Sequence, residues 1–287
     1  MLAGTLTPAP GLTLTRMGYG AMQLAGPGVF GPPKDPGTAV AVLRHAVDAG
    51  VTHIDTADFY GPTVVNELIR EALHPYPEEL RIVTKVGCRR GPDGSWNLLR
   101  DPAELREQVH ENLRHLDVEA LDVVNLRFGT PEAPSGESLG EAFSALAALR
   151  DEGLIRHLGL STVTSAQLSE AQTIAPVVTV QNHYNLAHRE DDALVERCAA
   201  EGIAYVPYFP LGGFSPLQSR VLTEVAARLG ASPQQVALAW LLGRSETIAV
   251  IPGTSSLGHL RENLAAAEVE LPEEAVVELD GVGGGRV

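Results

Sequence analysis

The chain has 287 residues, of which 44% are hydrophobic and 20% charged, and its formal net charge is −15. This composition is typical of a globular protein with a sizeable core, and the length allows two ordinary domains or one α/β barrel. The negative charge argues against nucleic acid or an anionic membrane as a partner. The apolar runs stay well short of a membrane span, and the N-terminal residues lack the pattern of a secretory signal.

The two cysteines, Cys88 and Cys198, lack the spacing of a metal site or a redox motif. Such sparse cysteine usage suits a reducing compartment, so we expect a cytoplasmic protein. The histidines show no ligand spacing either, and we predict no metal site. The expected partner is a small molecule, and the chain is expected to be a monomer or a weak homo-oligomer.

Short β-branched runs alternate with helical patterns along most of the chain. The expected strands are residues 16–22, 51–55, 81–87, 121–127, 155–161, 177–183, 203–208 and 247–253. Several of the amphipathic stretches between them open with Ser or Asp followed by Pro, which is a helix-start signature. Eight strands separated by helices predict an α/β fold, a (β/α)8 TIM barrel of parallel strands. A doubly wound sheet is the alternative, but no strand leads into a G-x-G-x-x-G turn.

Two segments extend the regular barrel pattern. Residues 5–15 read as a β-hairpin around Pro-Ala-Pro-Gly, ahead of the first barrel strand. Residues 215–230 predict an extra helix between the seventh strand and its regular helix, and further helices follow at the C-terminal end. The pattern contains no domain boundary, so we expect residues 1–287 to form a single barrel domain.

Functional groups cluster where the predicted strands end, which is the side of a barrel that carries the chemistry. Asp55 ends the second strand, Tyr60 lies in the loop that follows, and Lys85 lies near the end of the third strand. A nearby lysine ammonium lowers the pKa of a tyrosine from its ordinary value near ~10, and an aspartate fixes the lysine. Such a tyrosine can protonate a carbonyl oxygen.

Hydride must then reach the carbonyl carbon, and no side chain carries hydride, so this chemistry requires a nicotinamide cofactor. The loops after strands seven and eight are where barrels commonly bind phosphate. Here they contain Gly212, Gly213 and Gly253, and then Thr254 and Ser255 just ahead of a helix. Backbone N–H groups at a helix start attract anions, so we expect the cofactor's phosphates there.

The motifs HIDTADFYG, TKVG, LGLST, VQNHYN, YFPLGG and IPGTSSLGHLRENL occur in this order along the chain. In sequence and position they resemble the aldo-keto reductases, and the resemblance covers nearly the whole chain. It implies that Tyr60 is the proton donor, that Lys85 lowers its pKa and that Asp55 pairs with the lysine. The expected activity is NADPH-dependent reduction of an aldehyde or ketone.

The same resemblance assigns a series of cofactor contacts. Ser161 and Gln181 would hold the nicotinamide carboxamide, Thr162 stands where many members have Asn, and Tyr208 would stack on the nicotinamide ring. Leu211 and Gly212 would line the pyrophosphate. The resemblance favours NADPH over NADH as the cofactor. Arg261 is close in sequence to the residues expected at the extra phosphate of NADPH. The residues expected around the phosphates and the adenosine are Gly253, Thr254, Ser255, His259 and Asn263.

Arg127 is the main departure from the family pattern, because it stands where most members have a fourth catalytic residue, a histidine. With Asp55 and Lys85 cancelling, the arginine gives the pocket a net charge of about +1. We therefore expect it to select carbonyl substrates with a nearby phenolate, carboxylate or phosphate. The pattern is most similar to the bacterial branch that contains pyridoxal reductase, and pyridoxal is an aromatic aldehyde with an ionisable phenol.

Some alternatives remain at this point. One alternative is that Arg127 pairs with a loop carboxylate such as Glu132 and points away from the site. Another is that His183 replaces the missing histidine. Trp96 is either a wall of the substrate pocket or a loop anchor. For the function, the alternatives are a nicotinamide-binding regulatory or redox-sensing subunit with little turnover, and a barrel hydrolase or isomerase. The last lacks paired carboxylates at strand ends other than Asp55 and Asp58.

Overall fold

The computed structural model describes residues 2–130, 133–213 and 217–283. Seven parallel strands form one curled sheet in the order β11-β10-β9-β8-β5-β4-β3. Residues 248–250 close the circle, because Ile248 bridges Tyr205 of β11 and Val250 bridges Met17 just before β3. This arrangement confirms the predicted (β/α)8 barrel. The barrel strands are β3 (Tyr19–Gly20), β4 (His53–Asp55), β5 (Arg81–Val86), β8 (Leu121–Arg127), β9 (Ile155–Ser161), β10 (Val177–Gln181) and β11 (Ala204–Tyr205).

The seventh and eighth strand positions are shorter than their sequences suggest. Of residues 203–208 only two form strand, and residues 247–253 contribute isolated bridges rather than a continuous strand. Their backbone groups are nevertheless paired: Tyr205 N donates to Thr247 O at 3.0 Å, and Val250 N donates to Arg16 O at 2.8 Å. The barrel therefore closes through a few hydrogen bonds, and the residues beyond them are left to form loops around the site.

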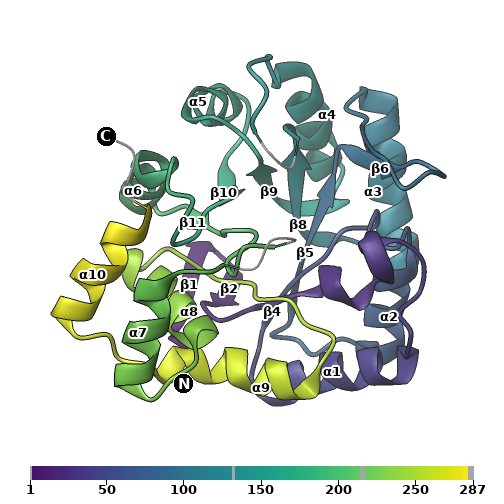
Figure 1. Ribbon diagram of the computed structural model, residues 1–287. Coiled ribbons are helices and arrows are strands. Elements are labelled where there is room, and N and C mark those ends of the chain that lie inside the picture. The colour runs from purple at the N-terminus through teal and green to yellow at the C-terminus, as the bar shows by residue number, and fades with distance from the viewer. Residues whose placement is uncertain (1, 131–132, 214–216, 284–287) are drawn as a thin grey trace.

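Helices surround the strands in Figure 1, and most of them lie between one strand and the next along the chain. Side-chain caps start several of them where the Ser/Asp-Pro signature predicts: Asp35 accepts from Thr38 N, and Ser232 and Gln235 form a reciprocal capping box. The helices are α1 (Pro36–Asp48), α2 (Val64–Leu73), α3 (Pro102–Leu116), α4 (Gly140–Asp151), α5 (Ser165–Gln172), α6 (Asp192–Glu201), α7 (Arg220–Leu229), α8 (Pro233–Arg244), α9 (Leu257–Ala265) and α10 (Glu273–Gly283). Short 3-10 turns are η1 (Ala21–Leu24), η2 (Pro27–Val29) and η3 (Ala266–Glu268).

The predicted N-terminal hairpin is formed by β1 (Thr5–Ala9) and β2 (Leu12–Thr15). Leu12 and Leu14 are fully buried against Val83, Val123 and Val178, which point into the barrel from three of its strands. The hairpin thus closes the amino end of the barrel with apolar side chains. Access to the barrel interior is left to the carboxyl ends of the strands.

A second hairpin was not expected. Residues predicted as a loop after β5 form β6 (Cys88–Arg90) and β7 (Trp96–Leu98), paired antiparallel. Across the described ranges of the chain, no helix combines the length and the apolarity needed to cross a bilayer.

Candidate active site

A cleft with a volume of about 150 Å³ lies where the parallel strands end. Asp55, Lys85, Arg127 and Ser161 reach it from the carboxyl-terminal parts of β4, β5, β8 and β9. The cleft therefore collects functional groups from four neighbouring strands, as the sequence predicts. The described residues that line it are Gly20, Met22, Gln23, Asp55, Tyr60, Lys85, Trp96, Arg127, Ser161, Tyr208, Phe209, Pro210, Leu211, Gly213, Ile251, Pro252 and Gly253.

Asp55 and Lys85 form a buried ion pair on one wall of this cleft. Lys85 Nζ lies 2.5 Å from Asp55 Oδ1 and donates a second hydrogen bond to the Thr56 backbone oxygen at 3.0 Å. Only 4% of each charged side chain is exposed. Burial disfavours the ammonium, but Asp55 and Tyr60 outweigh this effect and raise the pKa of Lys85. The lysine is therefore held in its charged form.

Tyr60 lies beside this pair, with Lys85 Nζ 5.2 Å from the centroid of its ring. Burial raises the pKa of Tyr60, while Lys85 and Arg127 act in the opposite direction. The lysine thus has the effect that the sequence predicts, but burial outweighs it, so the pKa of Tyr60 lies above its ordinary value. The Tyr60 hydroxyl accordingly stays protonated at neutral pH, as a proton donor must.

Gln181, at the end of β10, completes the surroundings of Asp55. Its Nε2 donates to Asp55 Oδ2 at 2.6 Å, which fixes the orientation of the amide. The other end of this amide, Oε1, is buried and has no hydrogen-bond partner among the described residues. Leaving a buried acceptor unmatched costs about 1–3 kcal/mol. The Gln181 side chain is fully buried and is not among the described residues that line the cleft.

Arg127 ends β8, the strand that pairs with β5, and lines the same cleft as Lys85. Its Cζ lies 5.9 Å from the Phe59 ring centroid and 5.4 Å from that of Trp96. Its Nε is buried and finds no hydrogen-bond partner in the described part of the chain. Glu132, the ion-pair partner that the sequence suggests as an alternative, lies outside the described residues. The guanidinium is therefore held by aromatic rings and keeps hydrogen-bonding capacity for the cleft.

Trp96 is both a wall of the cleft and an anchor of the β6–β7 hairpin. It lines the cleft beside Arg127, and its ring packs edge-on against Phe59 at 5.8 Å. Arg90, on the facing strand of the hairpin, lies 4.0 Å from the Trp96 centroid and donates to Val29 O at 2.7 Å. The hairpin is thereby tied to the loop that follows β3.

The predicted nicotinamide contacts are partly assembled around Tyr208. Ser161 and Tyr208 line the cleft, and Thr162 Oγ1 lies 3.4 Å from the Tyr208 hydroxyl. Thr162 has φ +59, a left-handed conformation that is unusual for a β-branched residue and that Asn adopts more readily. This conformation is one that the Asn implied by the family resemblance would adopt more readily than Thr.

His183, the alternative to the missing histidine, is not among the described residues that line the cleft. Its ring stacks on His188 at 3.9 Å and on Tyr208 at 5.7 Å. Burial and the neighbouring His188 lower the pKa of His183 to about 4, so the ring is neutral at physiological pH. The His183 ring thus packs nearly parallel to the Tyr208 ring, with an angle of 16° between their planes.

The predicted phosphate residues lie along the loops after β11 and before α9. Leu211 and Gly253 line the cleft, while Gly212, Thr254, Ser255, His259 and Asn263 are outside its lining. Gly253 has no room for a larger residue, because a Cβ there would lie 2.6 Å from Gly20 O. The Tyr19 hydroxyl donates to Thr254 O at 2.7 Å, and the Ser256 side chain caps α9 at His259 N. These contacts hold the start of α9 against the end of β3.

Residues 16–283 match the family model of the Aldo/keto reductase family. The chain belongs to this family. It is 58% identical over 272 residues to pyridoxine 4-dehydrogenase of Escherichia coli K12, covering 94% of this chain and 95% of that protein. An uncharacterized oxidoreductase of Schizosaccharomyces pombe is 40% identical over 273 residues, covering 95% and 88%. The crystal structure of a thermostable aldo-keto reductase with the inhibitor epalrestat superposes with a TM-score of 0.82 at 32% identity, covering 98% and 100%.

This aldo/keto reductase is therefore an oxidoreductase, and its fold is the barrel of the family. Sequence reasoning missed several residues of its cleft. Gly20 and Met22 lie in the weakest predicted strand and Gln23 follows it, and their sequence carries no charged or catalytic group that would mark them. Phe209, Pro210, Ile251 and Pro252 lie inside or beside motifs that were recognised, so their neighbours were the available signal.

Proposed function

We propose that this reductase uses NADPH to reduce an aldehyde or ketone to the alcohol, with Tyr60 as the proton donor. The observation that carries the proposal is the buried Asp55–Lys85 pair beside Tyr60 in a single cleft. General acid catalysis by a positioned side chain contributes about 10²–10⁴-fold to a rate. A protonated hydroxyl beside a fixed cation has the arrangement that this task needs.

In the proposed reaction, the substrate carbonyl oxygen accepts a hydrogen bond from Tyr60 and then its proton. The negative charge left on the phenolate is stabilised by the Lys85 ammonium, which Asp55 keeps in place. A bound nicotinamide supplies the hydride to the carbonyl carbon. Because Tyr60 and Lys85 are almost fully buried, little water competes for the developing charge.

The residues present fit a nicotinamide dinucleotide. The unmatched Gln181 Oε1 is a buried acceptor suited to a carboxamide N–H, and Ser161 lies in the cleft nearby. The Tyr208 ring offers an aromatic platform, which His183 supports. At the other end, the close approach of Gly253 to Gly20 leaves backbone groups free of side chains beside the start of α9.

The preference for NADPH over NADH is the finer part of the proposal. Arg261 is the cation on α9, and its Nε donates to His45 Nε2 of α1 at 3.4 Å. We propose that it contributes, with His259, Thr254 and Ser255, to holding the extra phosphate. Equilibrium titration of both cofactors against wild type and Arg261→Gln tests this, because only the NADPH dissociation constant is expected to rise.

The proposed substrate is pyridoxal or another aromatic carbonyl compound with an anionic oxygen. Arg127 supports this choice, since it brings a permanent charge to the cleft lining, and its buried Nε has no hydrogen-bond partner among the described residues. Trp96 lines the cleft beside the guanidinium and offers flat apolar surface to an aromatic ring, while Phe59 packs edge-on against Trp96. The relative in Escherichia coli is named for a dehydrogenation of pyridoxine at carbon 4, and the reverse of such a reaction reduces pyridoxal.

The first experiment is NADPH oxidation by the purified protein with pyridoxal, a carboxybenzaldehyde, a neutral benzaldehyde and a simple sugar aldehyde. Fast turnover of the two anionic aromatic compounds, lost in Tyr60→Phe, is the expected result. Equal rates on all four would keep the reductase and remove the role of Arg127. Binding of NADPH without turnover of any of them would contradict the proposal and favour a regulatory or redox-sensing role.

A further inference from the structure

A second cavity of about 120 Å³, here called the rear cavity, shares Lys85 with the catalytic cleft. Its lining includes Asp58, Thr63, Lys85, Arg89, Gln108 and Glu111, so it lies between the loop after β4, the start of the β6–β7 hairpin and α3. Water in the liquid takes up about 30 Å³ per molecule, which gives room for a few molecules. The catalytic lysine thus has a polar space beside it that the substrate does not enter.

A series of hydrogen bonds also connects Lys85 with Asp58. Lys85 donates to the Thr56 backbone oxygen at 3.0 Å, and the Thr56 hydroxyl donates to Asn66 Oδ1 at 2.8 Å. Asn66 Nδ2 in turn donates to Asp58 Oδ1 at 3.1 Å. An amide cannot pass a proton on, so these hydrogen bonds fix positions, and protons must move through the cavity beside them.

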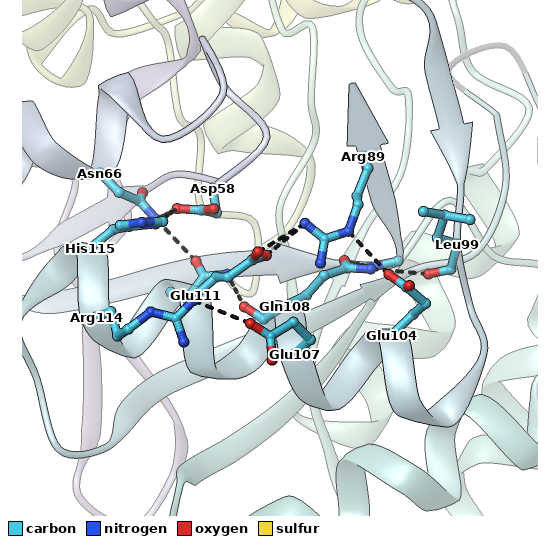
Figure 2. Close-up of polar contacts among 12 residues, drawn as sticks. Asp58, Asn66, Arg89, Leu99, Glu104, Glu107, Gln108, Glu111, Arg114 and His115 are labelled. Atoms are coloured by element: carbon cyan, nitrogen blue, oxygen red, sulfur yellow. Dashed lines mark hydrogen bonds and ion pairs between the residues drawn. The ribbon is translucent and has the colours of Figure 1, made fainter. Parts of the chain in front are cut away.

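Asp58 lines the rear cavity and pairs with His115, which is not among the described residues of the lining. Asp58 Oδ1 lies 2.7 Å from His115 Nδ1, and 14% of the Asp58 side chain and 24% of the His115 side chain are exposed. Figure 2 shows these two side chains with Asn66, next to Glu111 of α3. The pair therefore touches solvent on one side and the rear cavity on the other.

The charged groups around Asp58 come from every element that packs on the cavity. His115 and Glu111 face it from α3, Lys85 from β5, and Arg89, Arg90 and Cys88 from β6. Arg89 is bound by Glu111 at 2.8 Å and by Glu104 at 3.1 Å, as Figure 2 shows. Because Arg89 is neutralised in this way, Asp58 and His115 are left as a carboxyl–imidazole pair that the guanidinium does not bind.

We propose that Asp58 and His115 supply protons from solvent to Lys85 and Tyr60 through the rear cavity. This inference rests on the proposed reductase function, and it explains why a titratable pair that never meets substrate is built behind the catalytic lysine. The catalytic cleft is filled by cofactor and substrate during turnover. A separate path lets Tyr60 regain its proton before the product leaves.

The proton balance of the proposed step is simple. Tyr60 loses its hydroxyl proton to the substrate oxygen and becomes a phenolate. Lys85 passes one ammonium proton to the phenolate oxygen and takes one from water in the rear cavity. That water is reprotonated by Asp58, which regains its proton from His115 and the solvent, so one proton enters from bulk water in each reduction.

The test measures proton uptake and NADPH oxidation together, in a stopped-flow instrument with a pH-indicator dye and lightly buffered enzyme loaded with NADPH. In wild type, proton uptake is expected to follow NADPH oxidation without delay. Asp58→Asn keeps the hydrogen bonds to Asn66 and His115 but cannot carry a proton. In this variant the first NADPH oxidation keeps its rate, while proton uptake slows by about tenfold or more. Added formate, a small proton carrier, is expected to restore it.

A second variant and a control separate the path from the fold. Cys88→Leu fills part of the rear cavity without changing a charge and is expected to delay proton uptake in the same way. Glu107→Gln, on α3 but outside the cavity lining, is expected to behave as wild type. Undelayed uptake in both Asp58→Asn and Cys88→Leu overturns the path. A slowed first oxidation in Asp58→Asn also overturns it, because the residue would then act on chemistry rather than on resupply.

Failure of the proposed function gives a different result. If wild type oxidises no NADPH with any carbonyl compound, the reductase proposal falls, and the path falls with it. If wild type turns over and proton uptake is unaffected by the variants, only the path is wrong.

Discussion

Two neighbouring parts of the cleft wall, one from β4 and β5 and the other from β8 and the β6–β7 hairpin, differ in how their cations are bound. On the wall from β4 and β5, Lys85 is paired with Asp55 at 2.5 Å, and both side chains are 4% exposed. On the wall from β8 and the β6–β7 hairpin, Arg127 lies against Phe59 and Trp96, and its Nε lacks a partner among the described residues.

This difference shows that the Lys85 charge is already paired, whereas the Arg127 charge is available to a ligand. A buried pair whose members satisfy one another has little left to offer a ligand, so it can only position and stabilise groups beside it. A cation held by aromatic faces keeps its in-plane N–H donors free. We therefore assign the constant part of the chemistry to the Asp55 wall and substrate selection to the Arg127 wall.

Tyr60→Phe is expected to have the largest effect, because it removes the proton donor from the paired wall. Turnover should fall by about 10²–10⁴-fold. The NADPH dissociation constant, measured by equilibrium titration, should stay close to that of wild type. A loss of less than tenfold in the rate of NADPH oxidation would contradict the assignment.

Asp55→Asn is expected to cost more stability than any surface substitution. It leaves the Lys85 ammonium buried without its carboxylate, and breaking a buried pair in this way costs about 3–5 kcal/mol of unfolding free energy. Urea denaturation measures the effect. The matched control is Glu224→Gln, which breaks an exposed pair with Arg220 and should change stability by less than about 1 kcal/mol.

Arg127→His tests the available charge on the other wall. Histidine keeps a donor but removes the permanent charge, so the ratio of kcat/KM for anionic to neutral aldehydes should fall by about tenfold to a hundredfold, or ~1.5–3 kcal/mol. Arg106→Gln, which breaks a surface pair with Glu152, is the control and should leave the ratio unchanged. An unaltered ratio in Arg127→His would assign the arginine to structure.

The pH dependence of stability tests the burial of His53, the first residue of β4, which lies on the same strand as Asp55 and is fully buried. Burial lowers the pKa of His53 to about 4 from an ordinary 6.5. The unfolded chain therefore binds this proton first as pH falls, and stability is lost between those two values. About 2 kcal/mol should disappear from about pH 7 to about pH 5, and His53→Gln should lose that much less. Urea titrations at both pH values measure the difference.

Thr162→Asn is expected to have the smallest effect, beside the cofactor end of the cleft. The residue sits at φ +59, where a β-branched side chain is strained by about 1 kcal/mol or more and Asn is tolerated. The thermal midpoint of unfolding should rise by an amount that corresponds to ~1 kcal/mol of unfolding free energy. A lower midpoint would mean that the Thr162 contact with Tyr208 contributes more than the strain costs.

Much of the fold was predictable because its signals are local. The alternation of strands and helices, the Ser/Asp-Pro caps and the hairpin before β3 each depend on a few adjacent residues, and all were confirmed. The β6–β7 hairpin was missed because Cys88–Arg90 and Trp96–Leu98 are short and lack the alternation that marks a strand. The closure near Ile248 also depends on partners far away in sequence.

The site divides in the same way. The rule that barrel strands carry chemistry at their carboxyl ends was enough to bring Asp55, Tyr60, Lys85 and Arg127 together from the sequence, and all four line the cleft. The sequence could not say that burial outweighs the effect of Lys85 on the pKa of Tyr60. A pKa depends on how much solvent the neighbouring elements exclude, and that is a sum over the whole structure.

The sequence by itself therefore determined the barrel and which residues stand at the ends of its strands, since periodicity and strand order are written along the chain. The tertiary structure decided which charges are paired. Gln181 donates a hydrogen bond to Asp55, although the two residues are 126 positions apart in the sequence. Arg127 lies against Trp96 of the β6–β7 hairpin, and Asp58 contacts His115 of α3. Such contacts form only within a few ångströms, and that precision comes from packing between distant segments.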